Sequence, residues 1–175
     1  GTDAPRRVGL VPRSVTGLPA TLWSGQSGAI SAAQLARLRV PQLPAAQSLL
    51  FTVLLTEANP PTTGEDALVL ARIDTLMRLG ALEPALELAR QAGPDRSPAL
   101  FKRFFDAALL AEAEAEACAL LSQPAPPTAD YPAQIFCAAR GGDWTTAALL
   151  LGTARAVGDL NADAAERLAR FLDPD

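Results

Sequence analysis

Residues 73–92 read IDTLMRLGALEPALELARQA, and the stretches FFDAALLAEAEAEACALLSQ (104–123) and IFCAARGGDWTTAALLLGTA (135–154) repeat their pattern at a spacing of 31 residues. Each stretch carries a small residue at its eighth position, namely Gly80, Ala111 and Gly142. Other positions recur at the same spacing: Glu83 and Glu114, Phe105 and Phe136, and Ala107, Ala138 and Ala169. A fixed period of about 20–50 residues is typical of helical solenoids, in which each repeat packs on its neighbours.

Apolar periodicity, prolines and capping residues divide the chain into about nine expected helices and no strand. Ser31 with Gln34 predicts a capping box at the start of the first helix. Pro44 and Pro98 each fit a first helical turn, where a missing N–H costs nothing. The expected helices are 31–39, 44–57, 65–79, 83–92, 98–110, 112–121, 132–140, 144–157 and 162–172.

Residues 1–28 differ from the rest, because prolines and glycines alternate there without a helical period. We expect an extended N-terminal arm that is weakly held at its start and docked at its end by Leu18, Leu22 and Trp23. Leu10–Ser14 resembles a thrombin cleavage sequence and is read as part of the native arm. The predicted organisation is therefore an arm (1–28) and one helical-repeat domain (29–175).

Composition excludes several classes of function. The net charge is -4 and the arginines are dispersed, so no basic patch indicates nucleic-acid binding. The longest apolar run, Leu49–Leu55, is too short to span a membrane. The chain has no histidine, which removes the commonest general base and metal ligand. We therefore expect no catalytic residue, no metal site and no cofactor.

The turn and second helix of each repeat resemble tetratricopeptide-type repeats. Small residues follow that family's spacing in two copies: Gly80 with Ala85, Ala89 and Ala92, and Gly142 with Ala147, Leu151 and Ala154. The period is 31 residues where that family has 34, the first-helix Trp and Tyr signatures are missing, and Ala111 and Glu116 depart from the pattern in the middle copy. The resemblance implies an all-α fold, a right-handed α-α solenoid of helical hairpins that serves as a protein-interaction scaffold.

A second resemblance covers the whole chain. The segments Ile135–Cys137 and Gly142–Trp144 and the ending Phe171–Pro174 are similar to an uncharacterised group of bacterial exported proteins. Some members of that group are labelled "antifreeze", a label that rests on alanine richness and carries no functional argument here. The resemblance implies an exported bacterial protein.

Cys118 and Cys137 lie on consecutive expected helices, and both are equally far from the centre of the connecting loop. In an antiparallel hairpin they would sit at the same level, which a disulfide requires. Two free buried thiols are the alternative. A disulfide would place the protein in an oxidising compartment, in a bacterium the periplasm or outside the cell.

The run Glu112, Glu114 and Glu116 is the densest acidic cluster, and the helix dipole at a first turn explains it as a solvated face. Trp144 is expected to anchor the turn of its repeat. The three phenylalanines 101, 104 and 105 are more than one core stripe needs, which predicts that Phe101 or Phe104 is exposed. The candidate partner surface comprises Trp23, Phe101, Phe104, Phe171 and Leu172.

Phe171 and Leu172 fall in the last turn of an expected helix that is apolar on several sides. We therefore expect the solenoid to continue into further helical repeats, because terminal repeats normally present a polar outer face. The alternative is that the arm covers this end. The predicted function is a non-enzymatic scaffold or adaptor that binds a protein or peptide in the bacterial cell envelope. The alternative function is a cell-wall-acting enzyme or its regulatory domain.

Overall fold

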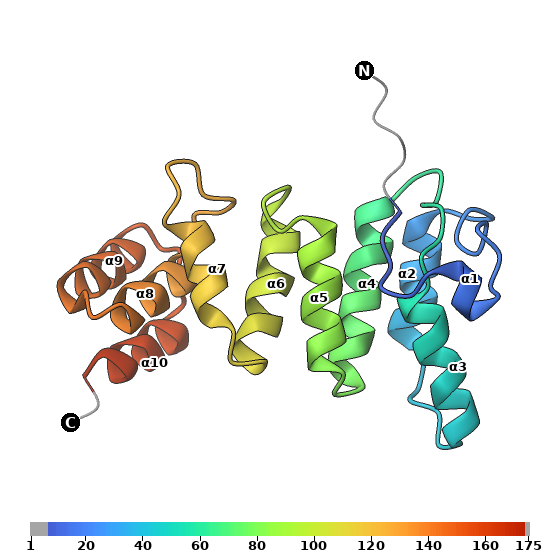
Figure 1. Ribbon diagram of the computed structural model, residues 1–175. Coiled ribbons are helices and arrows are strands. Elements are labelled where there is room, and N and C mark those ends of the chain that lie inside the picture. Colours follow the sequence, from blue (N-terminus) through green and yellow to red (C-terminus); the bar gives the residue numbers. More distant parts are fainter. Residues whose placement is uncertain (1–6, 174–175) are drawn as a thin grey trace. The chain divides into compact units, whose positions relative to one another are not determined.

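The computed structural model describes residues 7–173, and within this range the chain forms ten α-helices and no strand (Figure 1). The all-α prediction is therefore confirmed. The elements are α1 (Arg13–Thr16), α2 (Gly28–Arg37), α3 (Pro44–Leu55), α4 (Glu65–Arg78), α5 (Leu82–Ala92), α6 (Pro98–Leu110), α7 (Glu114–Leu121), α8 (Tyr131–Arg140), α9 (Trp144–Ala156) and α10 (Ala162–Leu172).

The chain divides into two compact units, Gly1–Ala113 and Glu114–Asp175. The sequence predicts instead one domain from residue 29 onward and a separate arm. The arm belongs to the first unit, because the main chain of Leu10 and Val11 bonds to Leu55 and the carbonyl of Ala20 accepts from Asn59. A sequence period shows that units repeat, but it does not show where long-range contacts become sparse.

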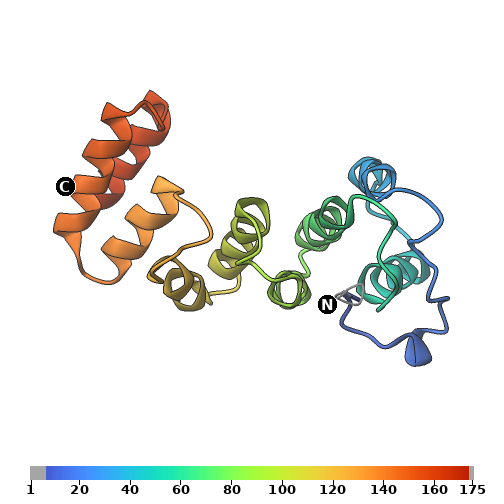
Figure 2. The ribbon, with the colours of Figure 1, turned by 90° about the horizontal axis from the view of Figure 1, so that it is seen from above.

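In the first unit, α4 packs against α2, α5 and α6. Seen from above, α2, α4 and α6 lie along one side of this unit and α3 and α5 along the other (Figure 2). The apolar stripes of α4, α5 and α6 meet between these layers, and their largest buried side chains are Leu68, Ile73, Leu76, Leu88, Leu100, Phe101 and Phe104. This local arrangement is compatible with helical hairpins, and the right-handed solenoid stays a prediction.

The helix–helix turns share one backbone motif. Gly80 and Gly142 have positive φ angles of 72° and 82°, and the N–H of the next residue bonds to a carbonyl five residues upstream. These bonds are Ala81 N to Leu76 O at 2.9 Å and Asp143 N to Ala138 O at 2.9 Å. The motif satisfies carbonyls that the helix end leaves without a partner, and glycine adopts the left-handed conformation without a Cβ penalty.

The middle turn departs from the predicted register by one residue. Ala111, the expected counterpart of Gly80, has a φ of −95°, whereas Glu112 takes the positive φ of 57°. The equivalent hydrogen bond runs from Ala113 N to Ala108 O at 2.8 Å. The helix after this turn consequently begins at Glu114 rather than at Glu112.

Local capping residues predict most of the observed helix ends. Ser97 Oγ accepts a hydrogen bond from Leu100 N, and Gly93 ends α5 in the left-handed conformation, as expected. The capping box at Ser31 is wrong. Helix α2 begins at Gly28, capped by Ser27, and Ser31 is buried inside it, accepting a hydrogen bond from Gln26 Nε2 at 2.9 Å.

In the second unit, α8 packs against α7, α9 and α10, and α9 also contacts α10. Ile135, Ala139, Ala147 and Leu151 form its buried cluster. Partly buried side chains from α10, including Leu168 and Leu172, pack against this cluster. The small residues Ala139 and Ala147 let α8 and α9 approach each other closely.

Candidate peptide-binding groove

The first unit carries an open groove on the layer formed by α2, α4 and α6. Its volume is about 460 Å³, and it is lined by Ala36, Ala71, Asp74, Thr75, Met77, Arg78 and Arg103. Most of these side chains come from α4, with one each from α2 and α6. The alanines make a shallow apolar floor, because their side chains fill little of the space between the three helices.

Charged groups stand at fixed positions in this groove. Arg103 Nε lies 2.5 Å from Asp74 Oδ1, so the sole carboxylate among the lining residues is paired with a cation. Arg78 donates to the carbonyls of Leu35 at 2.8 Å and Leu38 at 3.4 Å, at the C-terminal end of α2. The ion pair holds the Arg103 guanidinium and the hydrogen bonds hold that of Arg78 beside the apolar floor, where a ligand would meet them already ordered.

None of the groove residues stands out in the sequence. Ala36 and Ala71 look like ordinary helix formers, and Arg78 looks like a cation that complements the dipole of a helix end. The sequence offers one indication of these residues: they lie on the faces of α2, α4 and α6 opposite the apolar stripes that pack into the core. That signal becomes specific only when α2, α4 and α6 are known to lie in one layer.

Helix α3 presents a second apolar surface. No charged residue occurs between Val40 and Thr56, and Leu54 is the one buried residue of the helix. Leu49 is 60% exposed and Leu43, just before the helix, is 71% exposed. Leu49 on α3 and Leu43 just before it are thus two exposed apolar side chains that another molecule could contact.

The structure contradicts part of the predicted partner surface. Phe101 and Phe104 are both 0% exposed and lie in the core of the first unit, so the prediction that one of them is exposed is wrong. The reason is that α6 is covered by both α4 and α5, which buries a wider arc of its surface than a single stripe. The rings of Phe101 and Phe105 are tilted by 31° to each other, with centroids 5.8 Å apart.

The remaining members of that predicted surface have different environments. Phe171 is 44% exposed and its ring stacks on Phe136 at a centroid distance of 5.9 Å. Leu172 is half-buried against the core cluster of the second unit. Trp144, predicted to anchor its turn, is 53% exposed at the first position of α9, so that prediction is wrong. Of the predicted surface residues in the second unit, Phe171 alone is exposed.

Trp23 covers a buried guanidinium. Its ring lies 5.8 Å from the Arg72 Cζ atom, in cation–π geometry. Arg72 is 2% exposed, and burial lowers its pKa to about 10, so the side chain stays cationic at neutral pH. Trp23 therefore docks the end of the arm, as expected, and belongs to a structural cluster.

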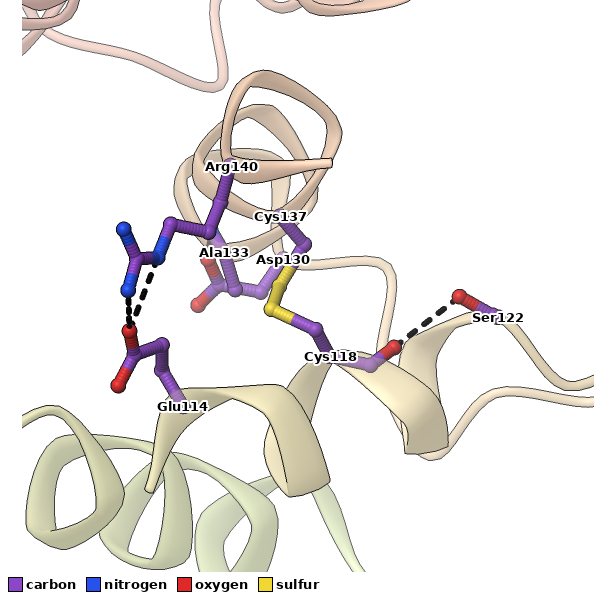
Figure 3. The surroundings of a disulfide bond; sticks show 7 residues. All are labelled: Glu114, Cys118, Ser122, Asp130, Ala133, Cys137 and Arg140. Atoms are coloured by element: carbon purple, nitrogen blue, oxygen red, sulfur yellow. Dashed lines mark hydrogen bonds and ion pairs between the residues drawn. A yellow bond between two sulfur atoms is a disulfide. The ribbon is translucent and has the colours of Figure 1, made fainter. Parts of the chain in front are cut away.

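Cys118 and Cys137 form a disulfide, with an S–S distance of 1.98 Å and Cα atoms 5.4 Å apart (Figure 3). The bond joins α7 to α8, as their equal distance from the loop centre predicts. Beside it, Arg140 Nε donates to Glu114 Oε1 at 2.9 Å. Hydrogen bonding to its own backbone N–H and to Arg140 holds the pKa of Glu114 below its usual value.

The acidic run therefore does not act as one group. Glu114 forms an ion pair with Arg140, whereas the sequence predicts a solvated face for all three glutamates. Within residues 7–173, no cluster of three or more His, Cys, Asp or Glu side chains could hold a metal ion. None of the helices in the described part of the chain is long and apolar enough to cross a membrane.

Comparison with protein-family models, curated proteins and solved structures finds no match to this chain.

Proposed function

We propose that this chain is a non-enzymatic helical module that binds another protein or peptide in the bacterial cell envelope. The observation that carries this proposal is the groove over α2, α4 and α6. Its floor is built from alanines and a methionine, an adaptable side chain, and its edges carry two arginines, Arg78 held by hydrogen bonds and Arg103 by an ion pair. We also infer that the helical hairpins stack as a right-handed solenoid.

The chemistry of the groove suits a peptide segment with an apolar anchor. Ala36 and Ala71 leave room for the backbone of a ligand, and Met77 adapts to an apolar side chain. The Arg78 guanidinium has five N–H donors and is fixed by the carbonyls of α2, so donors that these carbonyls do not use remain for a ligand carbonyl or carboxylate. Recognition by backbone and one anchor is common in peptide-binding domains.

Two observations support the non-enzymatic and envelope parts of the proposal. Asp74, the sole carboxylate lining the groove, is neutralised by Arg103, so it is poorly placed to act as a general acid in cell-wall hydrolysis. The Cys118–Cys137 disulfide supports an oxidising compartment, because disulfides persist mainly in exported proteins.

Peptide selection with a matched blocked variant tests the proposal. A displayed peptide library is selected on the wild-type chain and counter-selected on Ala71→Arg, which fills the floor of the groove with a long cation. We expect enriched peptides whose affinity falls at least about tenfold, or ~1.4 kcal/mol, in Ala71→Arg. The control is Ala148→Arg, an exposed position on α9 in the second unit, which should leave affinity unchanged.

Two results would count against the groove. One is that no peptide is enriched on the wild type over Ala71→Arg. The other is that both arginine variants weaken binding equally. Circular dichroism of both variants establishes that they remain helical, so that loss of binding reports the groove and not unfolding.

A further inference from the structure

The start of the described arm is bound to the first unit mainly through its main chain. Leu10 N and Val11 N donate to the Leu55 carbonyl at 2.8 and 3.0 Å, and Glu57 N donates to the Val11 carbonyl at 2.9 Å. Residues 8–11 (Val-Gly-Leu-Val) make two isolated β-bridges, Val8 with Ala58 and Val11 with Thr56, and bend at Leu10, and we call this short segment the arm strand. Side chains of the arm strand take no part in these three bonds.

Two side chains from helices of the first unit also bond to the main chain of the arm strand. The Gln91 amide on α5 makes both of its hydrogen bonds to one residue: Gly9 N donates to Oε1 at 2.6 Å, and Nε2 donates to Gly9 O at 3.1 Å. Arg72 Nη1 on α4 donates to Val8 O at 2.9 Å. Together with the backbone of residues 54–57, these two side chains form what we call the arm cleft.

At Gly9 the neighbouring backbone restricts which residue the arm strand can carry. A Cβ atom on Gly9 would lie 2.4 Å from both Cα and N of Glu57, which is too close for any side chain. Val8, the residue before it, is 4% exposed and fills an apolar site. The arm cleft therefore fits a segment with an apolar residue followed by glycine and then a bend at the third residue.

The arm strand is joined to the rest of the chain by a segment that can change conformation without disturbing the core. Val15, within the short helix α1, is 74% exposed, and none of the α1 residues is buried. The next main-chain anchor of the arm is the Ala20 carbonyl, which accepts from Asn59 N at 2.8 Å. Residues 12–19 therefore form a tether between two fixed points.

We propose that the arm cleft is a binding site for short, glycine-containing peptide segments, which the chain's own arm strand occupies, and that the arm strand of a second copy can occupy it in exchange. The bonds in the exchanged state are the same ones seen within the chain, since they come from the main chain, Gln91 and Arg72. Binding a peptide segment through its main chain is a general mode of peptide recognition.

The first test measures whether the arm strand leaves the cleft. Thrombin would cut after Arg13 only if residues 10–13 enter its active site as an extended chain, and Leu10 and Val11 are bonded to Leu55 in the seated arm. We expect Gly9→Ala, which cannot seat, to be cut at least about tenfold faster than the wild type. Equal cutting of the two proteins would overturn the proposal.

The second test measures binding in trans. A labelled synthetic peptide of residues 7–12 is titrated into the Gly9→Ala protein, whose cleft is free, and followed by fluorescence anisotropy. We expect saturable binding with one peptide per chain, and at least about tenfold weaker binding to the wild type, whose own arm competes. The same peptide with Gly9→Ala should not bind. A folded Gly9→Ala protein that binds both peptides alike, or neither, would overturn the proposal.

A third measurement addresses exchange between copies. Gly9→Ala supplies a free cleft, and Gln91→Ala supplies an intact arm with a weakened cleft. We expect a mixture of the two to form a 1:1 dimer by analytical ultracentrifugation, which neither forms alone. Peptide binding without this dimer would overturn exchange between copies.

If Gly9→Ala does not fold, the wild type is cut after folding by prolonged thrombin treatment, and exchange of its arm fragment for the labelled peptide replaces the titration. Retention of the fragment with no exchange would overturn the proposal.

Discussion

The two units are stabilised by different means. In the first unit, one buried guanidinium joins three segments: Arg72 donates to the carbonyls of Val8, Leu54 and Thr56 at 2.9, 2.8 and 3.2 Å. In the second, a disulfide joins α7 to α8. The guanidinium stabilises the folded state by satisfying buried acceptors, whereas a disulfide acts largely by restricting the unfolded chain. The first unit should therefore be insensitive to redox conditions and the second should not.

The largest effect is expected from removing the Arg72 guanidinium. Arg72→Met keeps much of the volume but leaves three buried carbonyls without donors, at about 1–3 kcal/mol each, partly offset because a desolvated cation is also removed. We expect a net loss of about 3–5 kcal/mol in the free energy of unfolding of the first unit. Urea unfolding followed by Trp23 fluorescence, in a Trp144→Phe background, measures it.

Arg78→Met is the matched control for Arg72→Met. Arg78 also donates to two backbone carbonyls, but its side chain is exposed, so water can replace it at those acceptors. We expect a loss of about 1 kcal/mol or less. Equal losses of unfolding free energy in the two variants would show that burial of the Arg72 guanidinium adds no stability.

Reduction of the disulfide should separate the two units experimentally. The cysteines are 19 residues apart, and closing a loop of this size stabilises a protein by about 3 kcal/mol in the chain-entropy model. We expect reductant, or Cys118→Ser with Cys137→Ser, to raise amide exchange across α7–α10 and to leave α4–α6 unchanged. Hydrogen exchange with mass spectrometry resolves the units. Alkylation of both cysteines in the denatured, unreduced protein would contradict the disulfide itself.

Features that depend on a few neighbouring residues were predictable. The Ser97-Pro98 start of α6 and the Gly93 end of α5 are local signals whose physics is complete within one helical turn. The cysteine pairing was predictable for a related reason. A hairpin of two consecutive helices fixes which positions face each other, so Cys118 and Cys137 could be matched by their distance from the loop.

Features that depend on distant segments were not predictable. Burial of Phe101 and Phe104 follows from two helices covering α6, and the arm cleft combines residues from 8 to 91. The groove likewise needs α2, α4 and α6 in one layer. No local sequence pattern indicates which distant segments will pack together. The start of the arm was expected to be weakly held; residues 1–6 lie outside the described part of the chain, and Val8, the second described residue, is buried.

The smallest effect concerns the turns that the units share. Glu112 has the left-handed conformation that glycine adopts at the equivalent turns, Gly80 and Gly142, and an L side chain there costs about 1–2 kcal/mol. Glycine would remove that cost while adding some entropy to the unfolded chain. We therefore expect Glu112→Gly to stabilise the protein by about 0.5–1 kcal/mol, measured as a rise in the urea midpoint at constant m-value.

Three variants test whether the stability gained by Glu112→Gly comes from the backbone conformation. Glu112→Ala removes the exposed carboxylate but keeps the strained φ, so it should not stabilise. Gly80→Ala and Gly142→Ala introduce the same strain where no neighbouring atom lies within 4 Å of the new Cβ, so their cost, about 1 kcal/mol each, comes from conformation alone. If Glu112→Ala stabilised as much as Glu112→Gly, the gain would come from the lost side chain and the shifted register of the middle turn would carry no conformational cost.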